Sequence, residues 1–318
     1  MIPPLRPICC LLLLGALGRT AFAQADTAAG SAPKKILFFS KSSGYEHRVI
    51  APPGAPVGTS PGNTHPGLAL EILRALGAKN GIAFTFSKDG SLFSPAYLDQ
   101  FDAYFFYTTG DLTETGTDGQ PAMTLAGKRA LLEAVRHGKG FIGVHSASDT
   151  FHSPGNKESK APERFQADGD KADDYIKMLG GEFIRHGKQQ PSHLIVIDPH
   201  FPGIALMSPR VAITEEWYSL KDFAPDLHVL LVQDTTGMTG PEYARPNYPS
   251  TWIRRHGQGR VFYTNLGHRD DMWQSARYQA LLLGAIRWTT GQVEADLTPN
   301  LSTAAPQAQV LPHYVKSP

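Results

Sequence analysis

Residues 140–149, with the sequence GFIGVHSASD, place a continuous apolar run directly before a polar turn. Such a run is typical of a strand that is buried on both faces of a parallel sheet. The preceding residues 124–137 carry apolar side chains at helical spacing, including Leu131 and Val135, and Gly138 ends the predicted helix. A helix that leads directly into a buried strand is the repeating unit of parallel α/β sheets.

The same alternation of short apolar runs and helical patterns extends along most of the chain. We expect strands at residues 35–40, 84–87, 103–107, 140–145, 194–198, 213–218, 228–232, 250–254 and 260–265, and helices near residues 66–77, 124–137, 172–179 and 273–289. This order predicts one α/β domain over residues 34–292, with a mostly parallel central sheet.

Two segments fall outside the alternation. Residues 151–172 are charged and rich in Gly, Pro, Lys and Glu, so we expect an exposed excursion that is either a lid or, more simply, a solvated loop. Residues 293–318 show no clear periodicity and are predicted to form an irregular tail.

The N-terminal residues have the pattern of a secretory signal peptide. Arg6 precedes an apolar run, and an Ala-x-Ala cleavage site ends at Ala23. The run is about half of the roughly 20 residues that a membrane-spanning helix needs. We therefore expect cleavage after Ala23, followed by a flexible linker at residues 24–33. The mature protein is expected to have no membrane span and to be secreted across the inner membrane. The periplasm is the compartment that fits best.

The composition excludes several classes of function. Both cysteines, Cys9 and Cys10, lie in the predicted signal peptide, so the mature protein has no thiol nucleophile and no cysteine-ligated metal. The chain has 30 basic and 29 acidic residues, and this near-neutral balance argues against nucleic acid as a partner. The P-loop, dinucleotide-binding, zincin and serine-esterase motifs do not occur in the sequence.

Polar side chains follow the buried strand at residues 140–145. Ligands of open parallel sheets bind outside the carboxyl ends of the strands, so His145 and its neighbour Ser146 should face a crevice. An imidazole titrates near neutral pH and suits general acid–base chemistry, although His145 could instead only hydrogen-bond its loop. Asp149 could orient this ring, bind a substrate hydroxyl or cap a helix.

A second cluster follows the strand at residues 260–265. His268 lies just beyond its carboxyl end, so two histidines from distant parts of the chain could share one pocket. Arg269 could bind a hydroxyl or carbonyl oxygen. Trp273 could pack on a sugar ring, but an isolated tryptophan at the start of a helix is more often part of the core.

A pair of glutamates, Glu215 and Glu216, lies in the strand expected at residues 213–218. Adjacent strand residues point to opposite faces, so at most one of the two can face a given pocket; Glu216 is our candidate. Tyr218 is a candidate for substrate binding.

The remaining polar candidates are weaker. Tyr45 and His47 follow the first strand and could contact a polar ligand, and His186 is a further substrate-binding candidate. The sequence requires no cofactor. A divalent metal site stays open but undecided, because no pair of its candidate ligands has a diagnostic spacing; those ligands are His145, His186, Glu216 and His268.

Four segments, in this order, resemble motifs of one family. GVHSASDTF (143–151) resembles an H-x-x-x-D-T element, MLGGEFIRH (178–186) a G-G-x-F-x-x-H element, EEWY (215–218) a D-E-x-Y element, and GQGRVFYTNLGH (257–268) a G-x-G-R-V-F-Y-x-x-L-G-H element. These are motifs of the ThuA-like, trehalose-utilisation family. The resemblance covers about residues 34–291, with Glu215 standing where the family usually has aspartate.

This resemblance implies the fold of class I glutamine amidotransferases, a flavodoxin-like three-layer sandwich. In those enzymes a cysteine occupies the position of His145, and the histidine of their triad falls at His268. The resemblance therefore excludes glutaminase chemistry here, because no mature side chain can form the thioester.

The family is associated with disaccharide use through 3-keto sugars that a partner oxidoreductase makes. The resemblance thus implies a carbohydrate-active protein that cleaves 3-keto-glycosides, with His145 or His268 as the base and with Asp149 and Glu216 orienting groups or donating protons. Two alternatives stay open: a non-catalytic sugar-binding module of the same fold, and direct glycoside hydrolysis by Asp149 and Glu216, which needs carboxyl groups about 5 to 9.5 Å apart.

Overall fold

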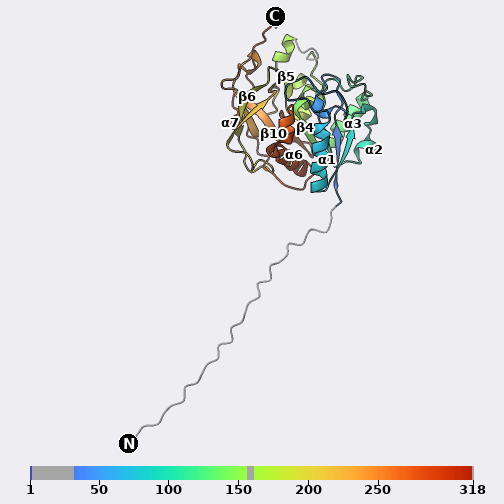
Figure 1. The fold of residues 1–318 in the computed structure, drawn as a ribbon. Coiled ribbons are helices and arrows are strands. Elements are labelled where there is room, and N and C mark those ends of the chain that lie inside the picture. The colour runs from blue at the N-terminus through green and yellow to red at the C-terminus, as the bar shows by residue number, and fades with distance from the viewer. Residues whose placement is uncertain (2–31, 156–160, 317–318) are drawn as a thin grey trace. The chain divides into compact units, whose positions relative to one another are not determined.

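The computed structural model describes residue 1, residues 32–155 and residues 161–316 (Figure 1). Residues 2–31, which contain the predicted signal peptide and nearly all of the predicted linker, lie outside the described residues. From residue 33 onward the described chain belongs to one compact unit. Within the described ranges, no helix has both the length and the apolar character that crossing a bilayer requires.

A nine-stranded sheet forms the centre of this unit. Its strands are β1 (Lys34–Phe39), β2 (Ile82–Ser87), β3 (Ala103–Phe106), β4 (Gly140–Val144), β6 (Gln190–Val196), β7 (Arg210–Glu215), β9 (His228–Asp234), β10 (Tyr248–His256) and β11 (Gly259–Thr264). Their order is β2-β1-β3-β4-β11-β10-β9-β6-β7. The five strands from β2 to β11 are parallel, and the other four extend the sheet with antiparallel pairs.

Helices cover both faces of this sheet. They are α1 (Leu68–Asn80), α2 (Pro95–Leu98), α3 (Leu125–Arg136), α4 (Asp174–Leu179), α5 (Asp270–Gln274), α6 (Ala276–Thr289) and α7 (Leu301–Ala304). Side chains alternate along each strand, so β1 supplies both cores: Ile36 and Phe38 pack with α1 and α6, whereas Leu37 and Phe39 pack with α2, α3 and α4. The mixed α/β fold with a mostly parallel central sheet, predicted from the sequence, is confirmed.

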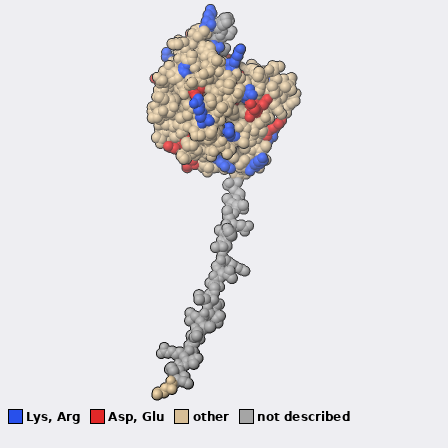
Figure 2. Space-filling model, turned by 60° about the vertical axis from the view of Figure 1, so that its left-hand side comes forward, with Lys and Arg blue, Asp and Glu red and all other residues tan. Residues whose placement is uncertain are grey.

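Charged side chains of both signs are scattered over the face that Figure 2 shows. This distribution agrees with the near-equal numbers of basic and acidic residues in the chain. A face without a broad patch of like charges does not steer a strongly charged partner toward it.

The strand expected at residues 213–218 is interrupted. β7 ends at Glu215 in the large sheet, and β8 (Tyr218–Lys221) pairs with β5 (Glu182–His186) in a separate two-stranded sheet. Trp217, between them, is fully buried, and its indole N–H donates to the carbonyl of Gln190 at 2.9 Å. The chain therefore changes sheets at Glu216 and Trp217, which frees Glu216 from the alternation of a regular strand.

The last part of the chain also differs from expectation. The helix predicted at residues 273–289 is two helices, because Ser275 has extended backbone angles between α5 and α6. The tail is not wholly irregular: residues 301–304 form α7, and Leu301 is buried in the same core as β9.

The excursion at residues 151–172 is only partly solvated. Arg164 and Phe165 are buried, and the Arg164 guanidinium donates to the carbonyl of Ile184 at 3.1 Å. The expectation of an exposed loop is wrong for these residues, because the guanidinium finds carbonyl and carboxylate partners inside. Residues 156–160 lie outside the described part of the excursion.

Candidate functional site

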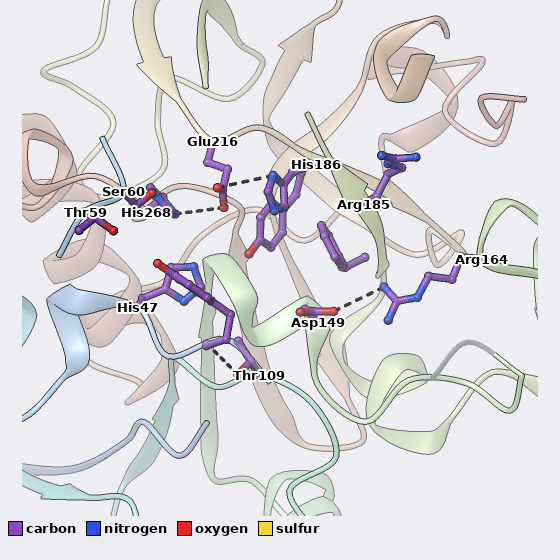
Figure 3. A pocket seen from close by; sticks show the side chains of 13 residues that line it. His47, Thr59, Ser60, Thr109, Asp149, Arg164, Arg185, His186, Glu216 and His268 are labelled. Atoms are coloured by element: carbon purple, nitrogen blue, oxygen red, sulfur yellow. Dashed lines mark hydrogen bonds and ion pairs between the residues drawn. The ribbon is translucent and has the colours of Figure 1, made fainter. Parts of the chain in front are cut away.

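A cavity opens where the carboxyl ends of several strands meet (Figure 3). Its volume is about 690 Å³, within the range usual for small-molecule sites. It is lined by Tyr45, His47, Thr59, Ser60, Thr109, Asp149, Arg164, Phe183, Arg185, His186, Glu216, Tyr218 and His268. The position agrees with the rule that ligands bind at the carboxyl edge of open α/β sheets.

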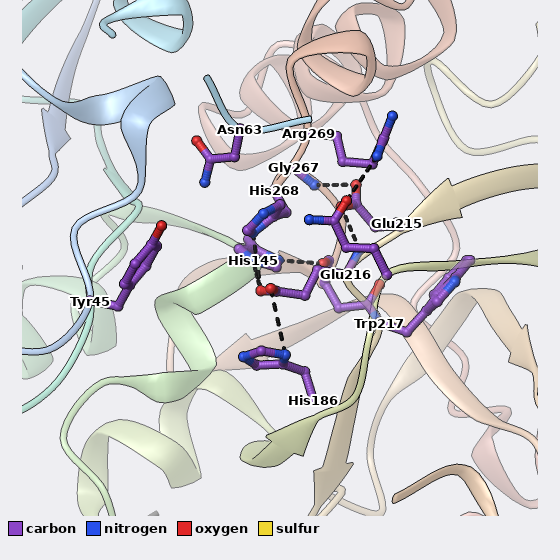
Figure 4. Close-up of polar contacts among 12 residues, drawn as sticks. Tyr45, Asn63, His145, His186, Glu215, Glu216, Trp217, Gly267, His268 and Arg269 are labelled. Atoms are coloured by element: carbon purple, nitrogen blue, oxygen red, sulfur yellow. Dashed lines mark hydrogen bonds and ion pairs between the residues drawn. The ribbon is translucent and has the colours of Figure 1, made fainter. Parts of the chain in front are cut away.

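Four buried side chains converge at the wall of this cavity, and we call them the His–Glu cluster: His47, His145, Glu216 and His268 (Figure 4 shows the last three). The ring centroids of His145 and His268 are 5.3 Å apart, and that of His47 lies 4.9 Å from His145 and 5.2 Å from His268. The four residues follow β1, β4, β7 and β11, so the sheet topology brings together parts of the chain that are far apart in sequence.

Glu216 is the anion of the cluster. Its Oε2 lies 3.0 Å from Nδ1 of His268 and 3.4 Å from Nε2 of His145. Its Oε1 lies 3.5 Å from Nδ1 of His186, an exposed ring at the cavity wall. Three imidazoles thus surround one carboxylate (Figures 3 and 4).

The turn after β4 fixes the position of His145. Its φ is 45°, in the left-handed region, which costs a non-glycine residue roughly 1–3 kcal/mol unless the surroundings hold it there. The ring is held by a hydrogen bond from Nδ1 to the carbonyl of Asn265, at 2.9 Å. Because a carbonyl only accepts, Nδ1 carries a proton, and Nε2 faces Glu216.

Burial sets the charge states of the cluster. It lowers the pKa of His145, against the opposing effect of Glu216, and it lowers the pKa of His47 far more. Burial alone would raise the pKa of Glu216, but the contacts with His145 and His268 outweigh it and hold this pKa well below its usual value. At neutral pH we therefore expect an ionised Glu216 beside a neutral His47.

The neighbouring glutamate has a different role. Glu215 is fully buried, and it accepts hydrogen bonds from the backbone N–H groups of Glu216, at 2.9 Å, and Gly267, at 3.2 Å. Burial raises the pKa of Glu215 to about 7. Glu215 thus supports the loop that carries His268, while Glu216 lines the cavity.

On another wall of the cavity, an imidazole joins two carboxylates. Nε2 of His152 lies 2.6 Å from Oδ1 of Asp149, and its Nδ1 lies 2.9 Å from Oε1 of Glu182. Burial would lower the pKa of His152, but the contacts with Asp149 and Glu182 raise it overall. Arg164 lies 3.6 Å from Asp149 and contacts the His152 ring at 3.0 Å. We call Asp149, His152 and Glu182 the carboxylate–imidazole chain.

Sequence reasoning missed several residues at the cavity. His152 was overlooked because it opens the segment expected to be solvated, although its spacing of three from Asp149 offered a signal. Arg164 and Arg185 reach the cavity through tertiary contacts that have no local pattern.

Four of the sequence candidates do not line the cavity, and one of them, His145, lies directly behind His47 and His268. Arg269 is engaged elsewhere, in an ion pair with Asp271 at 2.9 Å. Trp273 is fully buried and donates to the carbonyl of Gly267 at 2.7 Å, as a core tryptophan does. Ser146 is fully buried, so its hydroxyl is not presented to the cavity. Tyr218 does line the cavity, with its ring centroid 4.1 Å from that of His145.

Two groups of side chains in the described ranges have the composition of a metal site. In the His–Glu cluster, one ligand atom from each residue lies within 4.8 Å of the others. The second group comprises Asp168, Glu182 and Asp222. The ammonium group of Lys221 already provides a positive charge to this second group, because its Nζ lies 2.6 Å from Oδ2 of Asp168.

Comparison with known proteins identifies relatives of this chain. The ThuA family model, described as trehalose utilisation, matches residues 58–289. A crystal structure of a ThuA-like protein from Bacteroides uniformis superimposes with a TM-score of 0.57, at 18% identity, covering 83% of this chain and 94% of that one. One from Parabacteroides merdae has a TM-score of 0.51 at 17% identity, covering 89% and 98%. No curated protein matches significantly.

Proposed function

The chain belongs to the ThuA family, described as trehalose utilisation, and from this premise we propose that it cleaves keto-glycosides in the cavity above the His–Glu cluster. The observation that carries the proposal is the meeting, in one cavity of about 690 Å³, of an imidazole–carboxylate cluster and a separate carboxylate–imidazole chain. Two groups that can each move a proton are what an elimination at adjacent carbons requires.

The lining of the cavity suits a sugar. Carbohydrates present hydroxyl edges and apolar ring faces, and a site for them needs both polar groups and aromatic surfaces. The rings of Tyr45, Phe183 and Tyr218 border the cavity together with the hydroxyls of Thr59 and Thr109. Arg164 and Arg185 add donors that suit a carbonyl oxygen.

The proposed reaction begins at the carbon beside the ketone. A carbonyl at C3 acidifies the C2–H bond, and a base removes this proton. The electron pair forms a C1–C2 double bond as the bond from C1 to the leaving oxygen breaks, and an acid protonates that oxygen. Water then adds across the double bond, so the overall change is hydrolysis of the glycoside to two sugars.

We assign the two proton transfers to the two polar walls. His268 borders the cavity and His145 lies behind it, and both contact the ionised Glu216, so this wall suits proton removal. The second transfer is assigned to the other wall. Asp149 lines the cavity there, and its carboxylate contacts the imidazole of His152, whose pKa is raised, so this wall suits proton delivery.

Direct hydrolysis of ordinary glycosides by Asp149 and Glu216 is less well supported. That chemistry needs one protonated carboxyl group with a raised pKa. The pKa of Glu216 is instead held well below its usual value by its imidazole neighbours. Glu216 could therefore act only as the nucleophile or base of such a pair, and imidazoles already engage both of its carboxylate oxygens.

The proposal is tested by incubating the purified protein with trehalose and with its 3-keto derivative and by following the release of monosaccharide. We expect release from the keto sugar alone, and a loss of about 10²-fold or more in His268→Asn and in Asp149→Asn. His200→Gln, which changes an exposed histidine, is the matched control and should act as wild type. Binding of the keto sugar without any release would show a sugar-binding module instead.

We also propose that residues 1–23 direct export to the periplasm and are cleaved. The Ala-x-Ala site ending at Ala23 supports this proposal. N-terminal sequencing of protein from the periplasmic fraction should give a sequence that begins at Gln24, whereas an uncleaved chain confined to the cytoplasmic fraction would contradict the proposal.

An oxidoreductase acting on the C3 hydroxyl of a disaccharide would supply the keto-glycoside substrate.

A further inference from the structure

The His–Glu cluster has more buried nitrogen atoms than hydrogen-bond partners. Both ring nitrogens of His47, both of His268 and Nε2 of His145 are buried, and no described residue forms an aligned hydrogen bond with them. Nδ1 of His268 lies 3.0 Å from Glu216 but is not aligned for a hydrogen bond. Buried polar groups are nearly always satisfied, so five such nitrogens in one place require an explanation.

We propose that His47, His145, Glu216 and His268 bind one divalent first-row transition metal ion, for which Zn²⁺ is the representative. The inference does not rest on the proposed function, because binding of an ion is measured with no sugar present.

The spacing of the four side chains fits such an ion. Their ligand atoms all lie within 4.8 Å of one another. A tetrahedral ion with ligands at about 2.1 Å holds the ligand atoms about 3.4 Å apart. A pair at the 4.8 Å limit would have to close by about 1.4 Å, which small rotations of the side chains can supply.

The chemistry of the donor set indicates the class of ion. Three imidazoles and one carboxylate suit zinc and its neighbours, whereas magnesium and calcium prefer oxygen ligands. With neutral imidazoles the cluster carries one negative charge, that of Glu216. A divalent cation would compensate this buried charge.

The surroundings of the cluster orient its ligands. Nδ1–H of His145 donates to the carbonyl of Asn265, which leaves Nε2 as the ligand atom. The Asn265 side chain is held in turn by the hydroxyl of Ser250, at 2.6 Å, and by Gln233, at 3.0 Å. Such a buried network fixes an imidazole in the way that metal sites require.

The ion would be reachable from the cavity. His47, Glu216 and His268 line it, whereas His145 lies behind them. A ligand oxygen in the cavity could therefore complete the coordination. With an ion bound, His145 and His268 would be ligands, so the proton removal assigned to this wall applies to the protein without the ion.

The test is calorimetric titration of chelator-treated protein with Zn²⁺ and Co²⁺. We expect one ion per chain with a dissociation constant in the micromolar range or below, and visible Co²⁺ absorption bands of a four- or five-coordinate site. Glu216→Gln and His268→Asn should each weaken Zn²⁺ binding by about 100-fold or more, since changes even to residues behind the ligands cost 10–100-fold. His200→Gln should bind as wild type.

Far-UV circular dichroism of each variant shows whether it folds, and His47→Asn replaces any variant that does not. Absence of binding at 1 mM Zn²⁺, or binding by Glu216→Gln and His268→Asn as tight as that of wild type, overturns the inference. Release of sugar by chelator-treated protein is measured separately, so the metal site and the proposed function can fail independently.

Discussion

Replacing Glu215 by glutamine should change how the stability of the protein depends on pH. Glu215 is fully buried, and its two carboxylate oxygens accept from the backbone N–H groups of Glu216 and Gly267. Burial nevertheless raises its pKa to about 7 from the usual 4.5. The free-energy cost of ionising this buried group is therefore greater in the folded protein than in the unfolded chain.

The sign and the size of the effect follow from linkage. A carboxyl group with a raised folded pKa contributes its full stabilisation below the unfolded pKa and loses it as the pH rises through the folded value. The interval from 4.5 to about 7 corresponds to ~3 kcal/mol. Glutamine does not titrate, so Glu215→Gln should gain ~3 kcal/mol in free energy of unfolding relative to wild type between pH 4.5 and pH 7.5.

Urea denaturation, followed by tryptophan fluorescence at several pH values, measures this difference. Glu71→Gln, which changes a half-exposed glutamate in α1 that lies 3.6 Å from His65, is the matched control and should not reproduce the ~3 kcal/mol gain, because an exposed pair contributes at most about 1 kcal/mol. Only the change with pH is diagnostic, because the amide also alters the hydrogen bonds by a constant amount. A difference between Glu215→Gln and wild type that stays constant from pH 4.5 to 7.5 would refute the reasoning.

Three further predictions concern the walls of the cavity. His152→Gln should lower the turnover of a keto-disaccharide by about 10²-fold, because it removes the imidazole that contacts Asp149. The dissociation constant of the keto-disaccharide, measured by calorimetry, should change only a few-fold. Arg269→Gln should change turnover less than about 2-fold, since its guanidinium is paired with Asp271 outside the cavity. Trp273→Phe should cost about 2–4 kcal/mol in urea denaturation and leave KM unchanged, because it removes the donor to the Gly267 carbonyl and leaves a cavity beside Tyr107 and Tyr278, away from the pocket lining.

The parts of the fold that follow from local pattern could be predicted from the sequence. The run at residues 140–144 is buried throughout and forms β4 in the parallel half of the sheet. Its position, and that of β11, place His145 and His268 at the same edge. Periodicity and the geometry of parallel sheets are sufficient for this step.

The remaining features depend on tertiary contacts. The interruption of the strand at Glu216 and Trp217 is caused by burial of the indole and by pairing of β8 with β5, more than 30 residues earlier in the chain. Likewise, Arg164 looks like a surface residue in its charged segment but is buried against Ile184 and Asp149. No local sequence pattern predicts these tertiary contacts.

The central claim, removal of the C2 proton of a keto-glycoside in this cavity, is tested most directly in deuterium oxide. The purified protein is incubated briefly with a 3-keto-disaccharide, and the released keto sugar is analysed by mass spectrometry and NMR, with protein-free samples correcting for spontaneous exchange. The account predicts one deuterium at C2 of the product, formed by wild type and not by Asp149→Asn or His268→Asn. Release of a product that retains its original hydrogen at C2 would contradict it.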